Sequence, residues 1–448
     1  PSGPRLAPHV RSRTRRAVRV AVIGAGYVGL TTAACFAHLG HEVHCADVDA
    51  ERVARLKKGE VPILELGLPE LIKEGLAARR LEFVVGAATA AQSAQIVFLC
   101  VQTPQGTDGS ADLSFVESVA REIAPVLAPN TVVVNKSTVP VGSTRFVQRV
   151  LSEAGARAEG VTVASNPEFL REGQAVRDFL NPDRVVIGCE DHESAVRVSE
   201  LYKRIDAPVL VTDPASAEMI KYASNAFLAT KVSFINAIAN ICEAVDADAR
   251  EVAIGMGYDT RIGFQFLHPG PGYGGSCFPK DVAALLHISS SAGYDFELLA
   301  GVVDVNRAQH ERMIDKVRDA VGGNLSGVTV GLWGLTFKAD TDDLRDSPAI
   351  FIARRLLEEG AHVRAYDHGA GEKPRDLVPG LELCTDAYDA AAGADAVVLV
   401  TEWDEFRWLD FERVHNAMNG DAIVDARNLL DPAAMRRRGF AYQGVGRR

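Results

Sequence analysis

The sequence lacks the signals of a membrane protein, a nucleic-acid-binding protein and a metalloprotein. It has no uncharged apolar run of about 18 residues, the length that a membrane-spanning helix needs. Its net charge of −11 argues against a nucleic-acid partner, which requires a basic patch. Its seven cysteines contain no CxxC pair and no Cys/His spacing of a metal site, so we predict no bound metal. This odd number of cysteines, mostly in apolar runs, fits a reducing cytoplasm.

A chain of 448 residues is too long for one hydrophobic core, and strand and helix patterns divide it into several units. We predict an α/β fold with two Rossmann-like, doubly wound parallel-sheet domains joined by a long central helix. The predicted boundaries are a basic, disordered arm at 1–17, an N-terminal Rossmann domain at 18–213, a central helical domain at 214–322, and a C-terminal Rossmann-like domain at 323–448.

The run GAGYVG, residues 24–29, lies between a β-branched strand and a helical stretch. A second strand ends at Asp47, about twenty residues on, which completes the arrangement of a dinucleotide-binding unit. The Asp47 carboxylate favours NAD, because it binds ribose hydroxyls and would repel a 2′-phosphate. Arg52 could either bind such a phosphate or stack near the adenine. The predicted cofactor contacts from this unit are Gly24, Gly26, Tyr27, Val28, Gly29, Asp47 and Arg52.

Polar residues follow the next three predicted strands, at 95–101, 131–138 and the run VTVAS. Ligands of open parallel sheets bind beyond the carboxyl ends of strands, so Thr103 and Thr138 are expected beside the nicotinamide half of the cofactor. Glu168 and Glu172 lie four residues apart after the third strand. Two carboxylates on one turn can be a solvated helix face, but their place at this edge favours a role in a site.

Residues 215–246 form a long helical pattern without glycine or proline. Its length suggests a spine between domains or a dimer interface. Lys221 and Asn225 share one face of this helix, whereas Phe227 and Phe234 read as packing residues. A lysine on an apolar helix can also simply extend its amine to solvent.

Cys277 follows the glycines of the run RIGFQFLHPGPGYGGSCFPKD, residues 261–281, just before a predicted helix. We expect the glycines to let the main chain lie against a ligand. The helix N-terminus and Lys280 are expected to favour a thiolate, although a buried structural cysteine is the simpler interpretation. A thiolate is needed to oxidise an aldehyde, because the thiohemiacetal still carries a hydride and yields a thioester that water opens to an acid.

The last third shows strands at 328–335, 362–367, 396–401 and 422–427. The turn after the first of them lacks the glycine fingerprint, so this domain is expected to bind something other than a dinucleotide. Lys338 and Arg345 in that turn are candidate phosphate ligands.

With these motifs the chain resembles the UDP-glucose/GDP-mannose dehydrogenase family from about residue 18 to 430. The resemblance rests on GAGYVG, KSTVPVGST, SNPEFLREG, NPDRVVIG, KYASNAFLA, the 261–281 run and FKxxTDDxRxSPA. It implies an enzyme that uses two NAD to oxidise a nucleotide sugar, UDP-glucose favoured, at C6 to the uronic acid. It also implies that the C-terminal domain binds the nucleotide sugar and that the enzyme is a homodimer or larger homo-oligomer.

The resemblance also implies roles for single residues. Cys277 would be the nucleophile, Lys221 would stabilise oxyanions with Asn225 and Asp281 holding the network, and Glu168 would be the base for thioester hydrolysis through a water placed with Thr138. Further cofactor contacts would be Val101, Thr103, Thr138, Glu172, Lys280 and Arg345. Substrate contacts would be Glu168, Phe169, Leu170, Lys221, Asn225, Arg261 from a neighbouring subunit, Phe266, His268, Gly272, Tyr273, Gly274, Phe337 and Lys338, with Arg427 a weaker candidate.

Two runs depart from the family pattern, PILELGL at 62–68 and Phe337-Lys338-Ala339. Both can move loops beside the sugar nucleotide, so dTDP-glucose or another nucleotide hexose is an alternative substrate. A two-electron hydroxy-acid dehydrogenase, in which Cys277 is incidental, and a non-catalytic NAD-binding protein are the competing functions. The number of NADH formed per substrate distinguishes them.

Overall fold

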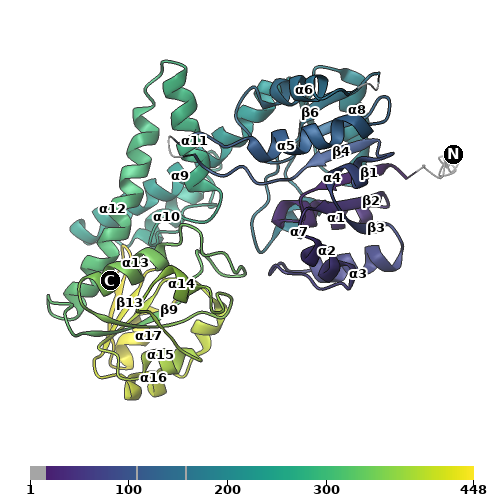
Figure 1. The fold of residues 1–448 in the computed structure, drawn as a ribbon. Coiled ribbons are helices and arrows are strands. Elements are labelled where there is room, and N and C mark those ends of the chain that lie inside the picture. The colour runs from purple at the N-terminus through teal and green to yellow at the C-terminus, as the bar shows by residue number, and fades with distance from the viewer. Residues whose placement is uncertain (1–16, 107–108, 157–158, 448) are drawn as a thin grey trace, which may run out of the picture.

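The computed structural model describes residues 17–106, 109–156 and 159–447, so the predicted basic arm lies outside the described residues except for its last position. Two sheet domains flank a group of long helices, as Figure 1 shows. The predicted fold class, two Rossmann-like domains joined by a long central helix, is confirmed. We keep the boundaries 18–213, 214–322 and 323–448 as a proposal.

The first sheet has eight strands in the order β3-β2-β1-β4-β5-β6-β7-β8. β6 and β7 pair antiparallel, whereas the other neighbouring strands pair parallel. The strands are β1 Arg19–Ile23, β2 Glu42–Asp47, β3 Leu81–Val85, β4 Ile96–Leu99, β5 Val132–Asn135, β6 Thr162–Ser165, β7 Val185–Gly188 and β8 Val209–Thr212. The helices are α1 Tyr27–His38, α2 Ala50–Lys57, α3 Leu68–Ala77, α4 Ala87–Ala91, α5 Ser114–Ile123, η1 Ala124–Val126, α6 Ser143–Glu153, α7 Ala175–Leu180 and α8 His192–Leu201. Two apolar clusters, one on each face, give the doubly wound core.

The central helices are α9 Pro214–Val245, α10 Ala249–Gly257, α11 Phe278–Ser291 and α12 Glu297–Ala320. α9 begins where the Asp213 carboxylate accepts the Ser216 amide at 2.8 Å, and it ends at Asp246 in the left-handed conformation. Among the described residues, α9 alone is long and apolar enough to cross a membrane. It packs against α11 and α12 and buries Glu218, Lys221 and Asn225 in bonds to other parts of the protein, so we describe it as a core helix.

The second sheet has six parallel strands in the order β11-β10-β9-β12-β13-β14. They are β9 Thr329–Trp333, β10 His362–Tyr366, β11 Glu382–Leu383, β12 Ala396–Leu399, β13 Ala422–Asp425 and β14 Ala441–Gly444. The helices around them are α13 Pro348–Glu358, α14 Pro374–Leu377, α15 Ala387–Ala391, η2 Asp404–Trp408, α16 Phe411–Ala417 and α17 Pro432–Arg437. The sequence pattern missed the short β11 and the edge strand β14, which carry weak apolar runs.

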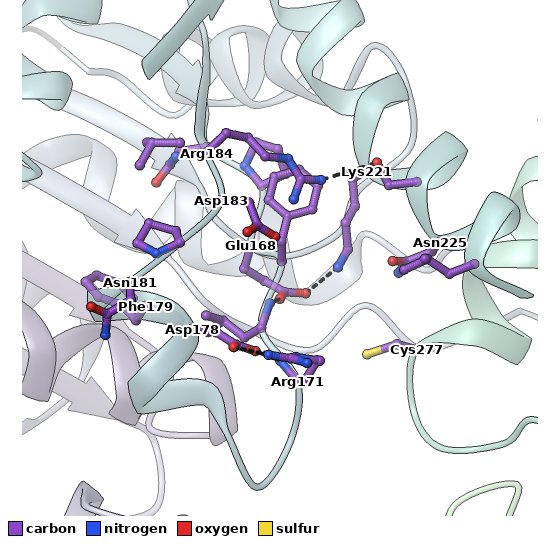
Figure 2. Close-up of a pocket in the computed structure, with 18 of the residues that line it drawn as sticks. Glu168, Arg171, Asp178, Phe179, Asn181, Asp183, Arg184, Lys221, Asn225 and Cys277 are labelled. Carbon is purple, nitrogen blue, oxygen red and sulfur yellow. Dashed lines mark hydrogen bonds and ion pairs between the residues drawn. The ribbon is translucent and has the colours of Figure 1, made fainter. Parts of the chain in front are cut away.

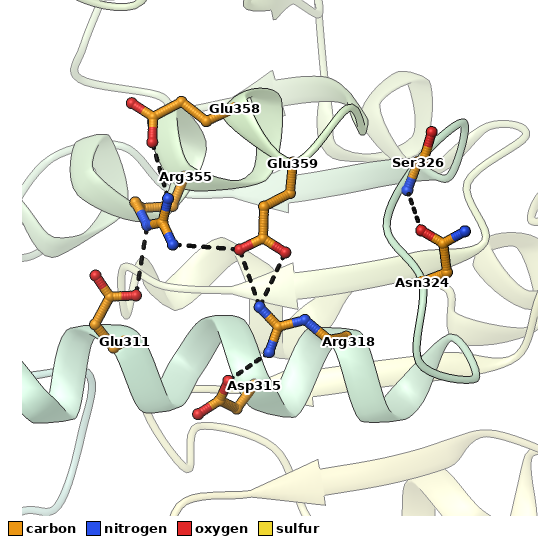
Figure 3. A network of polar contacts seen from close by, with 8 residues as sticks. All are labelled: Glu311, Asp315, Arg318, Asn324, Ser326, Arg355, Glu358 and Glu359. Carbon is orange, nitrogen blue, oxygen red and sulfur yellow. Dashed lines mark hydrogen bonds and ion pairs between the residues drawn. The ribbon is translucent and has the colours of Figure 1, made fainter.

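Charged side chains join the central helices to the second sheet domain (Figure 3). Arg318 on α12 contacts the carboxylate of Glu359 at 2.9 Å, and Arg355 on α13 reaches Glu311 on α12 at 3.4 Å. A single ion pair at a surface stabilises a fold little. These contacts, however, form one partly buried network of several charges. It holds α13, and the sheet behind it, against α12.

Candidate active site

A cavity of about 660 Å³ lies between the carboxyl edge of the first sheet and the central helices. Figure 2 shows its side chains, with Lys221 and Asn225 on α9, Glu168 on the loop after β6, and the Cys277 sulfur directed into the space between them. The cavity gathers seven of the predicted site residues: Glu168, Phe169, Leu170, Lys221, Asn225, Phe266 and Cys277. Residues from three distant parts of the chain therefore meet at one site.

Lys221 and Glu168 form a buried ion pair. The Lys221 ammonium is 2.7 Å from a Glu168 oxygen, with side chains only 4% and 6% exposed. The second Glu168 oxygen accepts the Leu170 amide at 2.6 Å. Burial works against both charges, but attraction to Lys221 brings the pKa of Glu168 below its usual value. Likewise, Glu168, Cys277 and Asp281 raise the pKa of Lys221 against the effect of burial, so both groups are charged at neutral pH.

Cys277 is the residue before α11, as predicted, but its thiol is not a ready thiolate. Burial raises the pKa of Cys277 to about 11, although the Lys221 charge opposes the shift. The predicted source of activation, Lys280, lies instead 3.1 Å from Asp281. Asp281 also accepts a hydrogen bond from the Asn225 amide at 2.6 Å. The expectation that Lys280 and the helix end favour the thiolate is therefore wrong for this structure, because burial outweighs them and the nearby cation is Lys221.

The glycines before Cys277 make room for protein neighbours. A Cβ on Gly272 would lie 2.6 Å from the His310 ring, and one on Gly274 would lie 2.0 Å from the Asp346 carbonyl oxygen. The backbone of Tyr273 between them is held by Asn306 on α12, which accepts its amide at 2.8 Å and donates to its carbonyl at 3.1 Å. The sequence predicted that these glycines let the main chain lie against a ligand. The structure gives close packing against α12 and the second sheet domain as the reason for these two glycines.

The GAGYVG turn fits a dinucleotide. Gly24 has a φ of +104° and Gly29 lies so close to the turn that an added Cβ would be 1.8 Å from the Gly24 carbonyl oxygen. At Gly26, in contrast, a Cβ would meet nothing within 4 Å, which leaves the N-terminus of α1 open to a phosphate. Asp47 accepts the Ala25 amide at 2.9 Å and lies 3.3 Å from Arg52, so Arg52 is directed at this carboxylate.

Three other predicted cofactor residues lie beyond the ends of β4 and β5. The Thr103 hydroxyl donates to the Thr138 carbonyl at 2.9 Å, and the Val101 carbonyl accepts the Ser137 hydroxyl at 2.6 Å. They lie at the carboxyl edge of the sheet, as the strand pattern predicts, but not among the residues that line the cavity.

Glu172 and Arg345 connect the two sheet domains. The loop that carries Glu168 and Glu172 is irregular and α7 begins only at Ala175, so the two carboxylates do not share a helical turn. The Glu172 carboxylate accepts the Ser276 hydroxyl at 2.8 Å and lies 3.3 Å from Arg345, which also binds Asp343. Burial, with Asp343 nearby, raises the pKa of Glu172 to about 7.

The remaining predicted substrate residues lie outside this cavity. Arg261 is 87% exposed and pairs with Asp259. His268 lines a second cavity, of about 870 Å³, together with Arg427. Arg427 donates to the Phe337 carbonyl at 2.6 Å, which joins it to the turn after β9 that also carries Lys338.

The main cavity is also lined by residues for which the sequence predicted no role, among them Arg184, Lys136 and Tyr202. Arg184 lies 3.6 Å from the centre of the Phe169 ring, and Lys136 and Tyr202 line the inner wall. Arg184 lies in NPDRVVIG and Lys136 lies in KSTVPVGST, two of the runs that carry the family resemblance. These motifs could have indicated both residues, although the sequence assigned neither a role. Tyr202, at the end of α8, has no motif around it.

Models of the UDP-glucose/GDP-mannose dehydrogenase family match this chain in three parts: the NAD binding domain at residues 18–206, the central domain at 215–308 and the UDP binding domain at 331–432. The UDP-glucose 6-dehydrogenase of Rhizobium meliloti is 46% identical over 96% of this chain and 100% of its own length, and that of Pseudomonas aeruginosa is 46% identical over 96% and 98%. A solved UDP-glucose dehydrogenase from Pyrobaculum islandicum has a TM-score of 0.91 and 38% identity, covering 99% of this chain and 100% of its own. The chain belongs to the UDP-glucose/GDP-mannose dehydrogenase family, and NAD is its cofactor.

Proposed function

We propose that this protein oxidises UDP-glucose at C6 to the uronic acid with two NAD per substrate. The observation that carries the proposal is the cavity in which the Cys277 thiol, the Lys221–Glu168 pair and Asn225 converge. The names of the relatives support UDP-glucose as substrate. In the overall reaction R–CH₂OH, two NAD⁺ and water give R–COO⁻, two NADH and three protons.

The chain's own residues bind and position the reacting groups. The turn at residues 24–29 and Asp47 hold the cofactor, which accepts the hydride in each oxidation. Lys221 stabilises the oxyanion that forms on C6. Asn225 and Asp281, which are hydrogen-bonded to each other, hold the side chains beside it in position. The sulfur of Cys277 bonds to the aldehyde carbon and its proton passes to the carbonyl oxygen, giving a thiohemiacetal that is oxidised to a thioester. Glu168, held as a carboxylate, takes a proton from the water that opens this thioester.

We place the nucleotide half of the substrate at the carboxyl edge of the second sheet. Lys338, Arg427 and His268 supply positive or hydrogen-bonding groups there, and the family match over 331–432 is to a UDP binding domain. Gly272 and Gly274 would contact the substrate only through their backbone.

Counting NADH per substrate tests the proposed reaction. Limiting UDP-, dTDP- and GDP-hexoses are each supplied with excess NAD, and NADH and sugar acid are measured at the end point. We expect two NADH and one uronic acid per UDP-glucose. One NADH per substrate with no acid would overturn the four-electron reaction in favour of a two-electron dehydrogenase, and binding without turnover would favour a non-catalytic NAD-binding protein.

Gly26→Ala should weaken NAD binding without loss of the fold. An added Cβ meets no protein atom within 4 Å, but it would stand where the pyrophosphate approaches. We expect a dissociation constant at least about tenfold higher, measured by titration of NAD against protein fluorescence, and an unchanged melting temperature. Gly29→Ala is the contrast, because its Cβ would collide with the Gly24 carbonyl and lower the melting temperature. Equal NAD affinity in Gly26→Ala and wild type would contradict this placement.

We propose a homodimer formed through α9. Phe227, Phe234 and Ile241, spaced seven residues apart, are 66%, 49% and 56% exposed, so the predicted packing role of the two phenylalanines is wrong within one subunit. A row of large apolar side chains on one helix face is typical of an interface. Arg261, which is exposed and does not line the cavity of its own chain, is proposed to reach the site of the partner.

Phe234→Glu should convert the dimer to monomers, because it places a charge in the apolar contact. Light scattering coupled to gel filtration measures the mass, and Phe115→Glu, an exposed phenylalanine on α5 at 48%, is the matched control. A wild-type mass near one chain would refute the dimer itself.

We also propose a cytoplasmic location. All seven cysteines are free in the structure, including the half-buried Cys277 and Cys384. A chain whose seven cysteines are all unpaired fits a reducing compartment.

A further inference from the structure

Lys136 is a buried lysine at the end of β5, in the wall of the cavity that holds Glu168 and Lys221. Its ammonium donates to the Asn166 side-chain oxygen at 3.1 Å and lies 3.3 Å from the Tyr202 hydroxyl. It also lies 5.7 Å from the centres of the Phe179 and Tyr202 rings. Both hydrogen-bonding partners are neutral, and within the described part of the chain no carboxylate forms an ion pair with this ammonium.

The hydrogen bond from Lys136 leads to the loop of the proposed base. Asn166 stands two residues before Glu168, and its amide donates to the Val186 carbonyl at 2.7 Å. The titratable groups around Lys136 are Glu168 on this loop, Lys221 on α9, Cys35 on α1 and Cys100 after β4, with Tyr202 directly after α8. Of these, Glu168 is the only group that is a carboxylate.

The position of this charge costs stability. Burial lowers the pKa of Lys136 to about 8, so its surroundings disfavour the ammonium even with Glu168 nearby. Without the ammonium, Tyr202 and Asn166 would remain hydrogen-bonded to each other, because the Tyr202 hydroxyl donates to the Asn166 side-chain oxygen at 2.5 Å. A buried charge that packing does not need points to a role in the chemistry of the site.

We propose that Lys136 is a positioning residue for the acid-forming step, which rests on the proposed function above. Its ammonium holds the Asn166 loop in place and keeps Glu168 a carboxylate while the Lys221 charge is shared with the oxyanion on the substrate. Glu168 is within the field of two buried cations, and Lys136 is the one that has no proposed contact with the substrate.

The step that depends on Lys136 is hydrolysis of the thioester. Water adds to the thioester carbon and gives one proton to Glu168, and the carbon–sulfur bond to Cys277 breaks as the carboxyl group forms. The sulfur leaves as a thiolate and is then protonated, and no electrons pass to or from the cofactor. A Glu168 carboxylate that is misplaced relative to the attacking water therefore slows the release of the acid more than the formation of NADH.

Lys136→Met is the test, with Lys136→Arg as the variant that keeps the charge. We expect Lys136→Met to melt at or above the wild-type temperature, yet to turn over at least about tenfold more slowly. In rapid mixing with UDP-glucose and NAD it should form two NADH per site in a burst and then stall. Intact-mass spectrometry should then show the sugar-acyl group on Cys277. When turnover is measured against pH, the fall on the low-pH side (the acid limb) should occur at higher pH than in wild type. The reason is that loss of a nearby cation raises the pKa of Glu168.

Three results would overturn the proposal: wild-type turnover in Lys136→Met, a slow variant with no acyl group on Cys277 and an unshifted acid limb, or a loss of melting temperature that accounts for the loss of activity. Lys136→Arg should restore the wild-type acid limb in part. Tyr202→Phe removes the neighbouring hydroxyl and keeps the charge, so its acid limb should match that of wild type. Failure of the proposed function is seen separately, because wild type itself would then form no uronic acid.

Discussion

Cys277→Ser is expected to abolish formation of the sugar acid, with a loss of at least about 10³-fold in turnover. The cavity keeps even the thiol protonated, with a pKa of about 11, and a serine hydroxyl gives up its proton far less readily. The serine variant should therefore lack the nucleophile that captures the aldehyde. End-point measurement of NADH and uronic acid, together with intact-mass analysis for a covalent adduct, checks this result.

The matched control for this variant is Cys384→Ser, because Cys384 is also free and half-buried but lies in the second sheet domain. It should retain wild-type turnover. If Cys277→Ser formed uronic acid at the wild-type rate, the covalent route would be excluded and Cys277 would be a structural cysteine.

Lys221→Met should remove turnover and also destabilise the fold by about 3–5 kcal/mol, because it leaves Glu168 buried without its partner. The pKa of Glu168 is lowered in the folded protein. Its contribution to the free energy of unfolding is therefore complete above the pKa of the unfolded state and is lost as the pH falls through the pKa of the folded state. The pKa of Lys221 is raised, so its contribution is complete below its unfolded pKa and is lost as the pH rises through its folded value. Urea unfolding at neutral pH therefore reports the full effect of the pair.

Two further variants separate the pair from a general effect of removing a lysine. Lys221→Met combined with Glu168→Gln should regain part of the stability, since no buried carboxylate is left unpaired. Lys203→Met breaks an exposed pair with Glu200, at 45% exposure on each side, and should change stability by less than about 1 kcal/mol. Equal destabilisation by Lys203→Met and Lys221→Met would contradict the importance of burial.

Features encoded over short stretches could be predicted from the sequence. The turn at residues 24–29 and the start of α11 after Cys277 follow from local backbone requirements and from hydrophobic periodicity. The length of α9 could be predicted for the same reason, because no glycine or proline interrupts it after Pro214. The strands of the first sheet that read as apolar β-branched runs, such as β4 and β5, also lie where that pattern put them.

The sequence by itself determined the fold class, the dinucleotide turn and the residue types available for chemistry, because these depend on neighbours along the chain. Only the tertiary structure decided which of these residues meet. Lys221 reaches Glu168 across 53 positions, and Lys136 reaches Tyr202 across 66. Only the tertiary structure also showed that Gly274 makes room for Asp346, and that burial raises the pKa of the Cys277 thiol while Lys221 opposes this shift. Packing and the removal of water set these properties, and both depend on groups that are remote in sequence.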